Sequence, residues 1–70
     1  MRENKQKICD LLCATLKETR DQDDLMELKY EQNDAGYETV TSIYNGGGSR
    51  TINVTMDSGV AMIRDIMKSL

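Results

Sequence analysis

Three short stretches contain residue types that could bind or transform a ligand. They are CDLLC at residues 9–13, DQDD at residues 21–24 and NGGGSR at residues 45–50. Paired thiols can hold a metal, clustered carboxylates can bind calcium, and glycines followed by a serine and an arginine can cradle a phosphate. Each possibility depends on the elements that position these side chains, because a ligand site needs several donors in one geometry.

The glycine stretch is predicted to be a turn. A phosphate-binding glycine loop follows a strand and opens a helix, so that free backbone N–H groups meet the anion. Here a strand-like pattern follows, which indicates a hairpin in which Asn45 begins the turn and glycine supplies positive φ. DSG at residues 57–59 does open a helix, but Asp57 would repel an anion and Ser58 would occupy the donors. We interpret it as a helix cap.

The other two stretches do not predict a metal site. Cys9 and Cys13 fall on one helical face, but zinc normally takes four ligands, and the chain has no histidine and no third cysteine. A disulfide is also unfavourable, because residues four apart on a helix have Cβ atoms about 5–6 Å apart, whereas a disulfide needs about 3.8 Å. We expect buried free thiols, with Cys13 nearer the edge of the apolar stripe. The acidic stretch lacks the glycine of a calcium loop and is predicted to be solvated.

Length, composition and charge exclude several classes of function. Seventy residues, 39% of them hydrophobic, predict a single small domain over residues 1–70 with a thin core. No apolar run approaches the roughly 18 residues of a membrane span, and the first ten residues lack the apolar segment of a secretory signal, so we expect a cytoplasmic protein. The net charge of −3 repels polyanions. Without histidine or a deep cleft, we expect no enzymatic activity and no cofactor.

The periodicity of the apolar residues predicts the first two elements. From residue 3 to about residue 20 they recur at helical spacing, at Ile8, Cys9, Leu12, Cys13 and Leu16. Residues 25–31 alternate as in a strand, and NDAG at residues 33–36 predicts a tight turn. The inward side chains of this strand are expected to be Met26, Leu28 and Tyr30.

Two further strands and a second helix follow. The pattern of residues 37–44 favours a register in which the inward side chains are Val40, Ser42 and Tyr44. The alternative register turns inward the side chains of Tyr37, Thr39, Thr41 and Ile43. In the third strand, residues 51–56, the inward set is Ile52, Val54 and Met56. The helix then begins at an N-cap, Asp57 or Ser58, and its apolar stripe is predicted to be Val60, Ile63, Ile66, Met67 and Leu70.

This order predicts an α+β fold, αβββα, in which two helices pack on one face of a three-stranded antiparallel sheet. The other face is left open and is mostly polar, so it is either a solvated surface or a surface for partner binding or self-association. Met62 sits beside the apolar stripe and either contacts the first helix or adds to an exposed patch. The candidate interaction residues are Thr39, Thr41, Ile43, Thr51, Asn53, Thr55 and Met62.

The αβββα order resembles that of the double-stranded RNA-binding domain. The resemblance implies RNA contacts from the first helix, from the loop between the first two strands and from the start of the second helix. Here these segments are residues 3–20, QNDAG at 32–36 and DSGVAMIRD at 57–65, and the last is acidic where the family has several lysines. Separately, INVTMDSGVAMIRDIMKSL at residues 52–70 looks like the tail of short uncharacterised proteins of bacterial mobile elements, which implies a bacterial origin.

These observations favour a small protein-interaction module without catalytic activity, whose partner is another protein or a second copy of the chain. The alternative is a degenerate nucleic-acid-binding domain of the double-stranded RNA-binding type. Clustering of the basic residues on one surface would favour nucleic acid, and their dispersal would favour a protein partner. The residues that decide between the two are Arg2, Lys5, Lys7, Lys17, Arg20 and Arg50.

Overall fold

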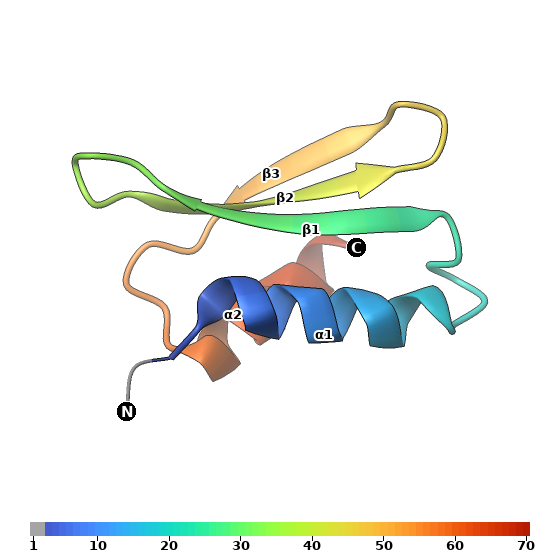
Figure 1. The fold of residues 1–70 in the computed structure, drawn as a ribbon, viewed down its shortest axis with the longest axis horizontal. Coiled ribbons are helices and arrows are strands. Elements are labelled where there is room, and N and C mark those ends of the chain that lie inside the picture. The colour runs from blue at the N-terminus through green and yellow to red at the C-terminus, as the bar shows by residue number, and fades with distance from the viewer. Residues whose placement is uncertain (1–2) are drawn as a thin grey trace.

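The computed structural model describes residues 3–70, which form a three-stranded antiparallel sheet packed against two helices (Figure 1). Along the chain the elements are α1 (Lys5–Lys17), β1 (Leu25–Gln32), β2 (Glu38–Tyr44), β3 (Ser49–Asn53) and α2 (Gly59–Ser69). Strand β2 lies in the middle of the sheet, and both helices lie below it, with α1 against β1 and α2 against β3. The predicted α+β class and αβββα order are confirmed. Neither α1 nor α2 is long and apolar enough to cross a membrane.

Two tight turns produce the antiparallel order. In the first, the side-chain oxygen of Asn33 accepts hydrogen bonds from the N–H groups of Ala35 and Tyr37, at 3.0 and 2.9 Å. In the second, Gly46 and Gly47 have φ angles of 90° and 94°, which residues with a side chain rarely adopt. NGGGSR is therefore the predicted hairpin connection, because it is followed by β3 and not by a helix.

The helix and strand faces agree with the sequence pattern over most of the core. Helix α1 is shorter than predicted at both ends: Asn4 caps its start by accepting a hydrogen bond from the N–H of Lys7 at 3.0 Å, and the helix ends at Lys17, before the C-cap Glu18. Val40 and Ser42 of β2 are buried, which confirms the favoured register. The buried apolar residues between the sheet and the helices are Cys9, Cys13, Leu16, Leu25, Leu28, Val40, Val54, Met62 and Ile66.

A β-bulge changes which side chains of β1 enter the core. The pairing of β1 with β2 shifts register between Leu25 and Glu27, so Leu25 is buried and Met26 is exposed. The prediction that Met26 points inward is wrong, because it assumed an unbroken alternation. The other two predicted side chains, Leu28 and Tyr30, do contribute to the core.

The chain also leaves the sheet earlier than predicted. Strand β3 ends at Asn53, and Met56 has a φ angle of 65°, in the left-handed region. The two-residue alternation therefore stops before Met56, which is 91% exposed. The prediction that Met56 points inward is wrong, whereas Val54 is buried as predicted.

The buried stripe of α2 is rotated relative to the predicted one. Its buried residues are Gly59, Met62 and Ile66, and its exposed apolar residues are Val60 and Met67. The two helices approach each other closely at Gly59, where an added Cβ atom would lie 2.9 Å from Cδ1 of Ile8. Gly59 has no side chain, so α2 can pack closely against α1 on this side. The stripe of α2 that contains Gly59 is therefore the buried one.

Candidate functional site

The face of the sheet opposite the helices is the candidate interaction surface and is called the open face below. Strand pairing places Thr41 between Lys29 of β1 and Thr51 of β3, and the hydroxyl oxygens of the two threonines are 2.9 Å apart. Because alternate side chains point to opposite faces of a sheet, the same pairing defines the rest of this surface. The open face consists of Glu27, Lys29, Glu31, Thr39, Thr41, Ile43, Ser49, Thr51 and Asn53.

The centre of the open face has no charged side chain. Strand β2 contributes Thr39, Thr41 and Ile43, which are half-buried between the side chains of the two edge strands. The charged side chains of this face come from β1 alone. The predicted interaction residues on β2 and β3 therefore lie together on one surface. The middle of this surface is uncharged, and Ile43 is its apolar residue.

Two of the predicted interaction residues do not belong to the open face. Met62 is fully buried in the core, so the expectation that it adds to an exposed patch is wrong. The rotation of α2 explains this, since Met62 lies on the same buried stripe as Gly59. Thr55 follows the end of β3, and its hydroxyl accepts a hydrogen bond from the N–H of Glu38 at 2.9 Å.

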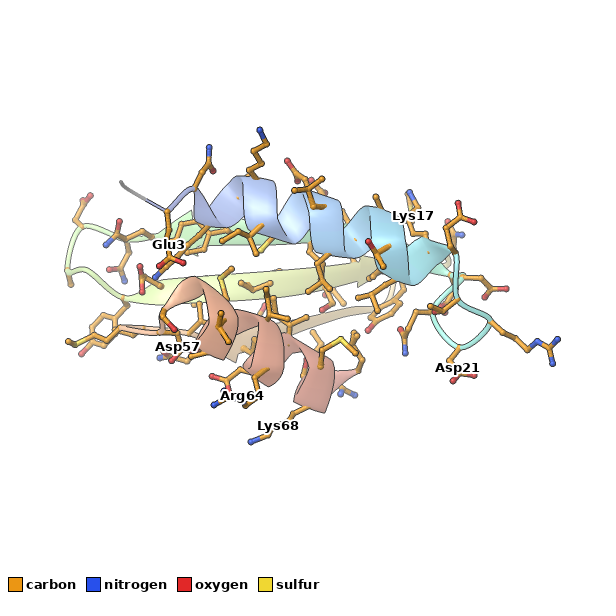
Figure 2. All side chains as sticks on the ribbon, turned by 90° about the horizontal axis from the view of Figure 1, so that it is seen from below. Glu3, Lys17, Asp21, Asp57, Arg64 and Lys68 are labelled. Atoms are coloured by element: carbon orange, nitrogen blue, oxygen red, sulfur yellow. The ribbon has the colours of Figure 1, made fainter. Side chains whose placement is uncertain are left out.

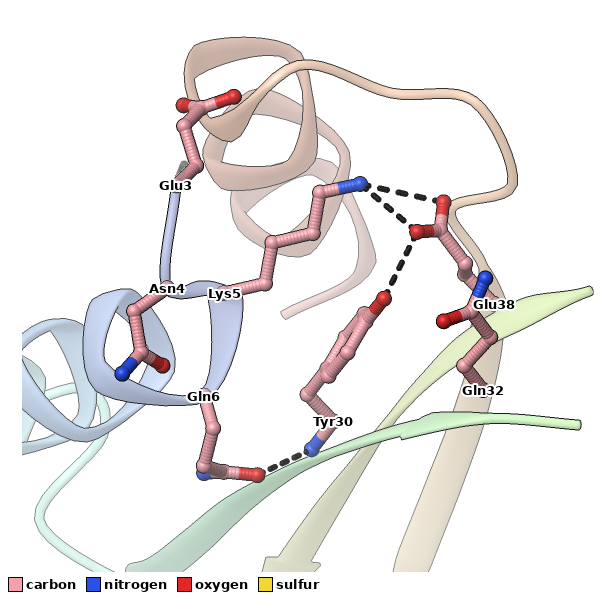
Figure 3. A pocket seen from close by; sticks show the side chains of 7 residues that line it. All are labelled: Glu3, Asn4, Lys5, Gln6, Tyr30, Gln32 and Glu38. Atoms are coloured by element: carbon pink, nitrogen blue, oxygen red, sulfur yellow. Dashed lines mark hydrogen bonds and ion pairs between the residues drawn. The ribbon is translucent and has the colours of Figure 1, made fainter. Parts of the chain in front are cut away.

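A second candidate site is a polar cluster at the start of α1, which the sequence analysis did not identify (Figure 3). The ammonium group of Lys5 lies 2.9 and 3.1 Å from the two carboxylate oxygens of Glu38. The hydroxyl of Tyr30 donates to the same carboxylate at 2.7 Å, and the N–H of Met56 donates to it at 2.9 Å. The residues around this pocket of about 670 Å³ are Glu3, Asn4, Lys5, Gln6, Tyr30, Gln32 and Glu38.

The electrostatics of this cluster stabilise a charged carboxylate beside a neutral phenol. The hydrogen bonds from Tyr30 and Lys5 lower the pKa of Glu38 below its ordinary value. Burial, together with the hydrogen bond to Glu38, raises the pKa of Tyr30 to about 12. The volume is within the roughly 300–1,000 Å³ of small-molecule pockets, but two of the charged groups that line it, Lys5 and Glu38, already bind each other.

A sequence signal for this cluster does exist. Glu38 alternates with Val40 and Ser42 and therefore lies on the inward side of β2, where an unpaired charge is costly. Lys5 lies one helical turn before Cys9 and shares its face of α1. A charged residue at an inward position of a strand predicts a buried partner of opposite charge, but the pattern alone does not say which lysine or arginine it is.

The start of α2 is capped by groups from the protein itself. Ser58 is the N-cap, and its side chain accepts a hydrogen bond from the N–H of Ala61 at 3.2 Å. The carboxylate of Glu3 accepts hydrogen bonds from the N–H of Gly59, at 2.9 and 3.1 Å. Side-chain oxygens therefore occupy donors that would otherwise meet an external anion, as expected for a cap. Nearby, a side-chain hydrogen bond with Asp65, together with burial and the charge of that carboxyl, raises the pKa of Asp57.

The two cysteines are free and buried, as predicted. Burial raises the pKa of the Cys9 thiol to about 11 and also raises the pKa of Cys13. A thiol with a raised pKa is a poor nucleophile and a poor metal ligand, because both roles require the thiolate. No cluster of three or more potential metal ligands occurs within residues 3–70.

The basic residues that distinguish the two proposed functions are distributed over α1, the segment after it and β3. Lys5 is paired with Glu38, and Arg50 donates a hydrogen bond to the backbone carbonyl of Ser69 at the end of α2. Lys17 is at the other end of α1 from Lys5, about 18 Å along a helix of this length. Arg2, which belongs to the same predicted set, lies outside the described residues. The remaining two residues of the set, Lys7 and Arg20, are exposed.

Comparison with known proteins does not assign this chain to a family. No family model, curated protein or solved structure matches it.

Proposed function

We propose that this chain is a small non-catalytic protein-interaction module and that the open face is its contact surface. The observation that supports this most directly is the uncovered sheet: both helices pack on one face, and no element from residues 3–70 covers the other. Along β2 this uncovered face is uncharged, and it includes Ile43. Depletion of charge at the centre of a surface is typical of the core of a protein–protein interface.

The arrangement of charges supports a protein partner over a nucleic acid. A protein that binds a polyanion needs several lysines or arginines on one surface. Here Lys5 and Arg50 are held by groups of the same chain, and Lys17 lies at the opposite end of α1 from Lys5. The polar cluster around Glu38 offers no unpaired acid and base, which supports a non-catalytic role.

The partner is either another protein or a second copy of the chain. A domain of 70 residues buries a smaller fraction of its surface on folding than a larger domain does, so association is a common way to complete its stability. The origin in a bacterial mobile element stays a prediction, and the genes that flank the coding sequence would test it.

The experiment compares three purified proteins: the unmodified chain, Ile43→Glu on the open face, and Met56→Glu as a matched control in an exposed loop. Thermal melting first establishes that all three fold. Sedimentation velocity over a range of concentrations then measures self-association, and immobilised protein captures partners from a lysate of the source organism. We expect Ile43→Glu to abolish the captured complex or the self-association and Met56→Glu to preserve it. A complex that survives Ile43→Glu unchanged, or no complex with any of the three proteins, would contradict the proposal.

The second candidate function is nucleic-acid binding, which the αβββα order favours through its resemblance to the double-stranded RNA-binding domain. The first two strands are joined by QNDAG, which has no basic residue, and the acidic Asp57 directly precedes the N-cap of α2. The topology alone therefore supports this alternative.

A further inference from the structure

The two helices have more apolar surface than the fold buries. Leu11 of α1 is 61% exposed, and Val60 and Met67 of α2 are 68% and 48% exposed. Ile63, one turn from both Val60 and Met67, is half-buried. Exposed single hydrophobic residues are ordinary, but several on neighbouring elements indicate a binding surface when they face the same way.

Helix geometry places these residues on one surface. Ile8 of α1 faces Gly59 of α2, and Leu11 lies one turn after Ile8, on the side away from the buried Cys9. On α2, Val60, Ile63 and Met67 form a line at i, i+3 and i+7 beside the buried stripe. Because the buried stripes face the sheet, these lines lie on the underside of the helix pair, the side from which Figure 2 is drawn. Leu11, Val60, Ile63 and Met67 are called the helix-side patch below.

Positively charged residues flank the helix-side patch. Arg64 and Lys68 point from α2 away from α1, as Figure 2 shows, and Lys7 is exposed one turn before Leu11 on α1. Two acidic residues lie near the α1 edge, because Glu3 is four residues before Lys7 and Asp10 is three residues after it. Asp10 accepts a hydrogen bond from Gln6 at 2.8 Å, and Asp65 is adjacent to Asp57. The basic edge of the apolar strip is therefore the one along α2, where Arg64 and Lys68 lie.

We propose that the helix-side patch docks an amphipathic helix of a partner protein whose apolar stripe is flanked by acidic residues. Val60 to Met67 spans about 10 Å along α2, or about two helical turns, which suits the i, i+3, i+4 and i+7 anchors of a bound helix. The basic edge along α2 complements the acidic residues of the ligand and would repel a basic helix. This surface is separate from the open face, so either proposal can fail without the other.

The charge pattern favours a protein helix over an anionic membrane. Sequences that bind anionic lipid headgroups usually have clusters of about four to eight lysines or arginines. The helix-side patch has three such neighbours, Lys7, Arg64 and Lys68, within a chain of net negative charge. Membrane binding is therefore an outcome that the experiment must distinguish.

The probe is a synthetic amphipathic helical peptide of about 14 residues, or about four turns, with leucines on one face and glutamates on both flanks. Two matched peptides serve as controls: one with lysines in place of the glutamates and one with the acidic sequence scrambled. Each is titrated into isotope-labelled protein while the amide signals are followed. We expect saturable shifts at Leu11, Val60, Ile63 and Met67 with the acidic helix, and binding at least about tenfold weaker with either control.

Substitutions then locate the site. The double substitution Val60→Glu with Met67→Glu should weaken binding of the acidic peptide by about tenfold or more. The double substitution Arg64→Glu with Lys68→Glu should weaken binding of the acidic peptide and strengthen binding of the lysine peptide. Ile43→Glu on the open face should change the affinity for neither peptide. These exposed positions should tolerate substitution. Melting curves of all variants, including Val60→Ala and Met67→Ala, check that each protein is folded. Equal binding of the three peptides, shifts elsewhere, or binding only to vesicles of phosphatidylcholine and phosphatidylserine would overturn the proposal.

Discussion

Glu38 is the shared hydrogen-bond acceptor of the polar cluster at the start of α1. Its inward position on β2 places a carboxylate next to the core, and three groups from separate parts of the chain bind it: the ammonium of Lys5, the hydroxyl of Tyr30 and the N–H of Met56. This cluster connects the start of α1 to the sheet and to the segment before α2. We interpret it as a structural network, because each charged or polar group is bound by another.

The pH dependence of stability tests this interpretation. Glu38→Gln should destabilise the fold by about 1–3 kcal/mol at neutral pH, because it removes hydrogen bonds to a charged group. The folded state lowers the pKa of Glu38, so the stabilisation is complete above the ordinary glutamate pKa of about 4.3 and is lost as the pH falls towards the lowered value. Urea unfolding of both proteins from pH 7 to pH 3 measures the difference. A difference that is constant over this range would contradict the ionised network.

At the scale of the elements, tertiary contacts override local pattern in two places. Because of the bulge in β1, Leu25 is in the core where alternation predicts Met26. Close packing against α1 at Gly59 sets which side of α2 is buried. The edge of β1 is also protected by a helix side chain. The amide of Gln6 donates to the carbonyl of Leu28 at 3.1 Å and accepts from the N–H of Tyr30 at 2.9 Å. Covering an edge in this way reduces pairing with other chains, whereas β3 has no such cover among residues 3–70.

The contact between the helices makes Gly59 sensitive to substitution. Gly59→Ala would place a methyl group against the carboxylate of Glu3 and 2.9 Å from Cδ1 of Ile8. We expect a loss of about 1–3 kcal/mol from overpacking, measured by thermal or urea unfolding. Gly48→Ala is the matched control, because an added Cβ there meets nothing within 4 Å and its φ is not positive. If both variants have the same melting temperature as the unmodified chain, the explanation of α2 burial by close packing at Gly59 is wrong.

At the scale of the whole molecule, charge distribution is the property that separates the two candidate functions. The net charge of −3 repels a polyanion at long range, and two of the basic residues, Lys5 and Arg50, are bound by groups of the chain itself. The two surfaces proposed for binding also differ in charge. The open face has its charged side chains on β1, and the helix-side patch is flanked by Arg64 and Lys68.

Nucleic-acid binding is therefore expected to be undetectable near physiological salt. An electrophoretic shift assay with duplex RNA and duplex DNA, at micromolar protein, measures this directly. A protein that contacts several phosphates loses affinity with salt at a logarithmic slope of about 0.9 per contact on a B-form duplex. A shift that weakens with salt and disappears in Lys7→Glu with Lys17→Glu would reverse the order of the two functions. Lys5 is left unchanged in this variant, because its ion pair with Glu38 supports the fold.

Local chemistry and periodicity were sufficient to predict the order of elements, the two turns, the register of β2 and the burial of both thiols. Glycine at positive φ, the two-residue alternation of Val40 and Ser42, and the helical spacing of Cys9 and Cys13 are properties of short segments, so the sequence alone determines them. The members of the open face on β2 and β3 follow from the same alternation.

Tertiary structure alone decided which of several apolar residues are buried and which polar groups meet. Met62 is buried and Met67 exposed because Gly59 faces α1, and Met26 is exposed because of a bulge in β1. The ion pair of Lys5 with Glu38 joins residues 33 positions apart. Contacts of this range depend on how whole elements are rotated and docked against each other, and the period of a short segment contains no information about that docking.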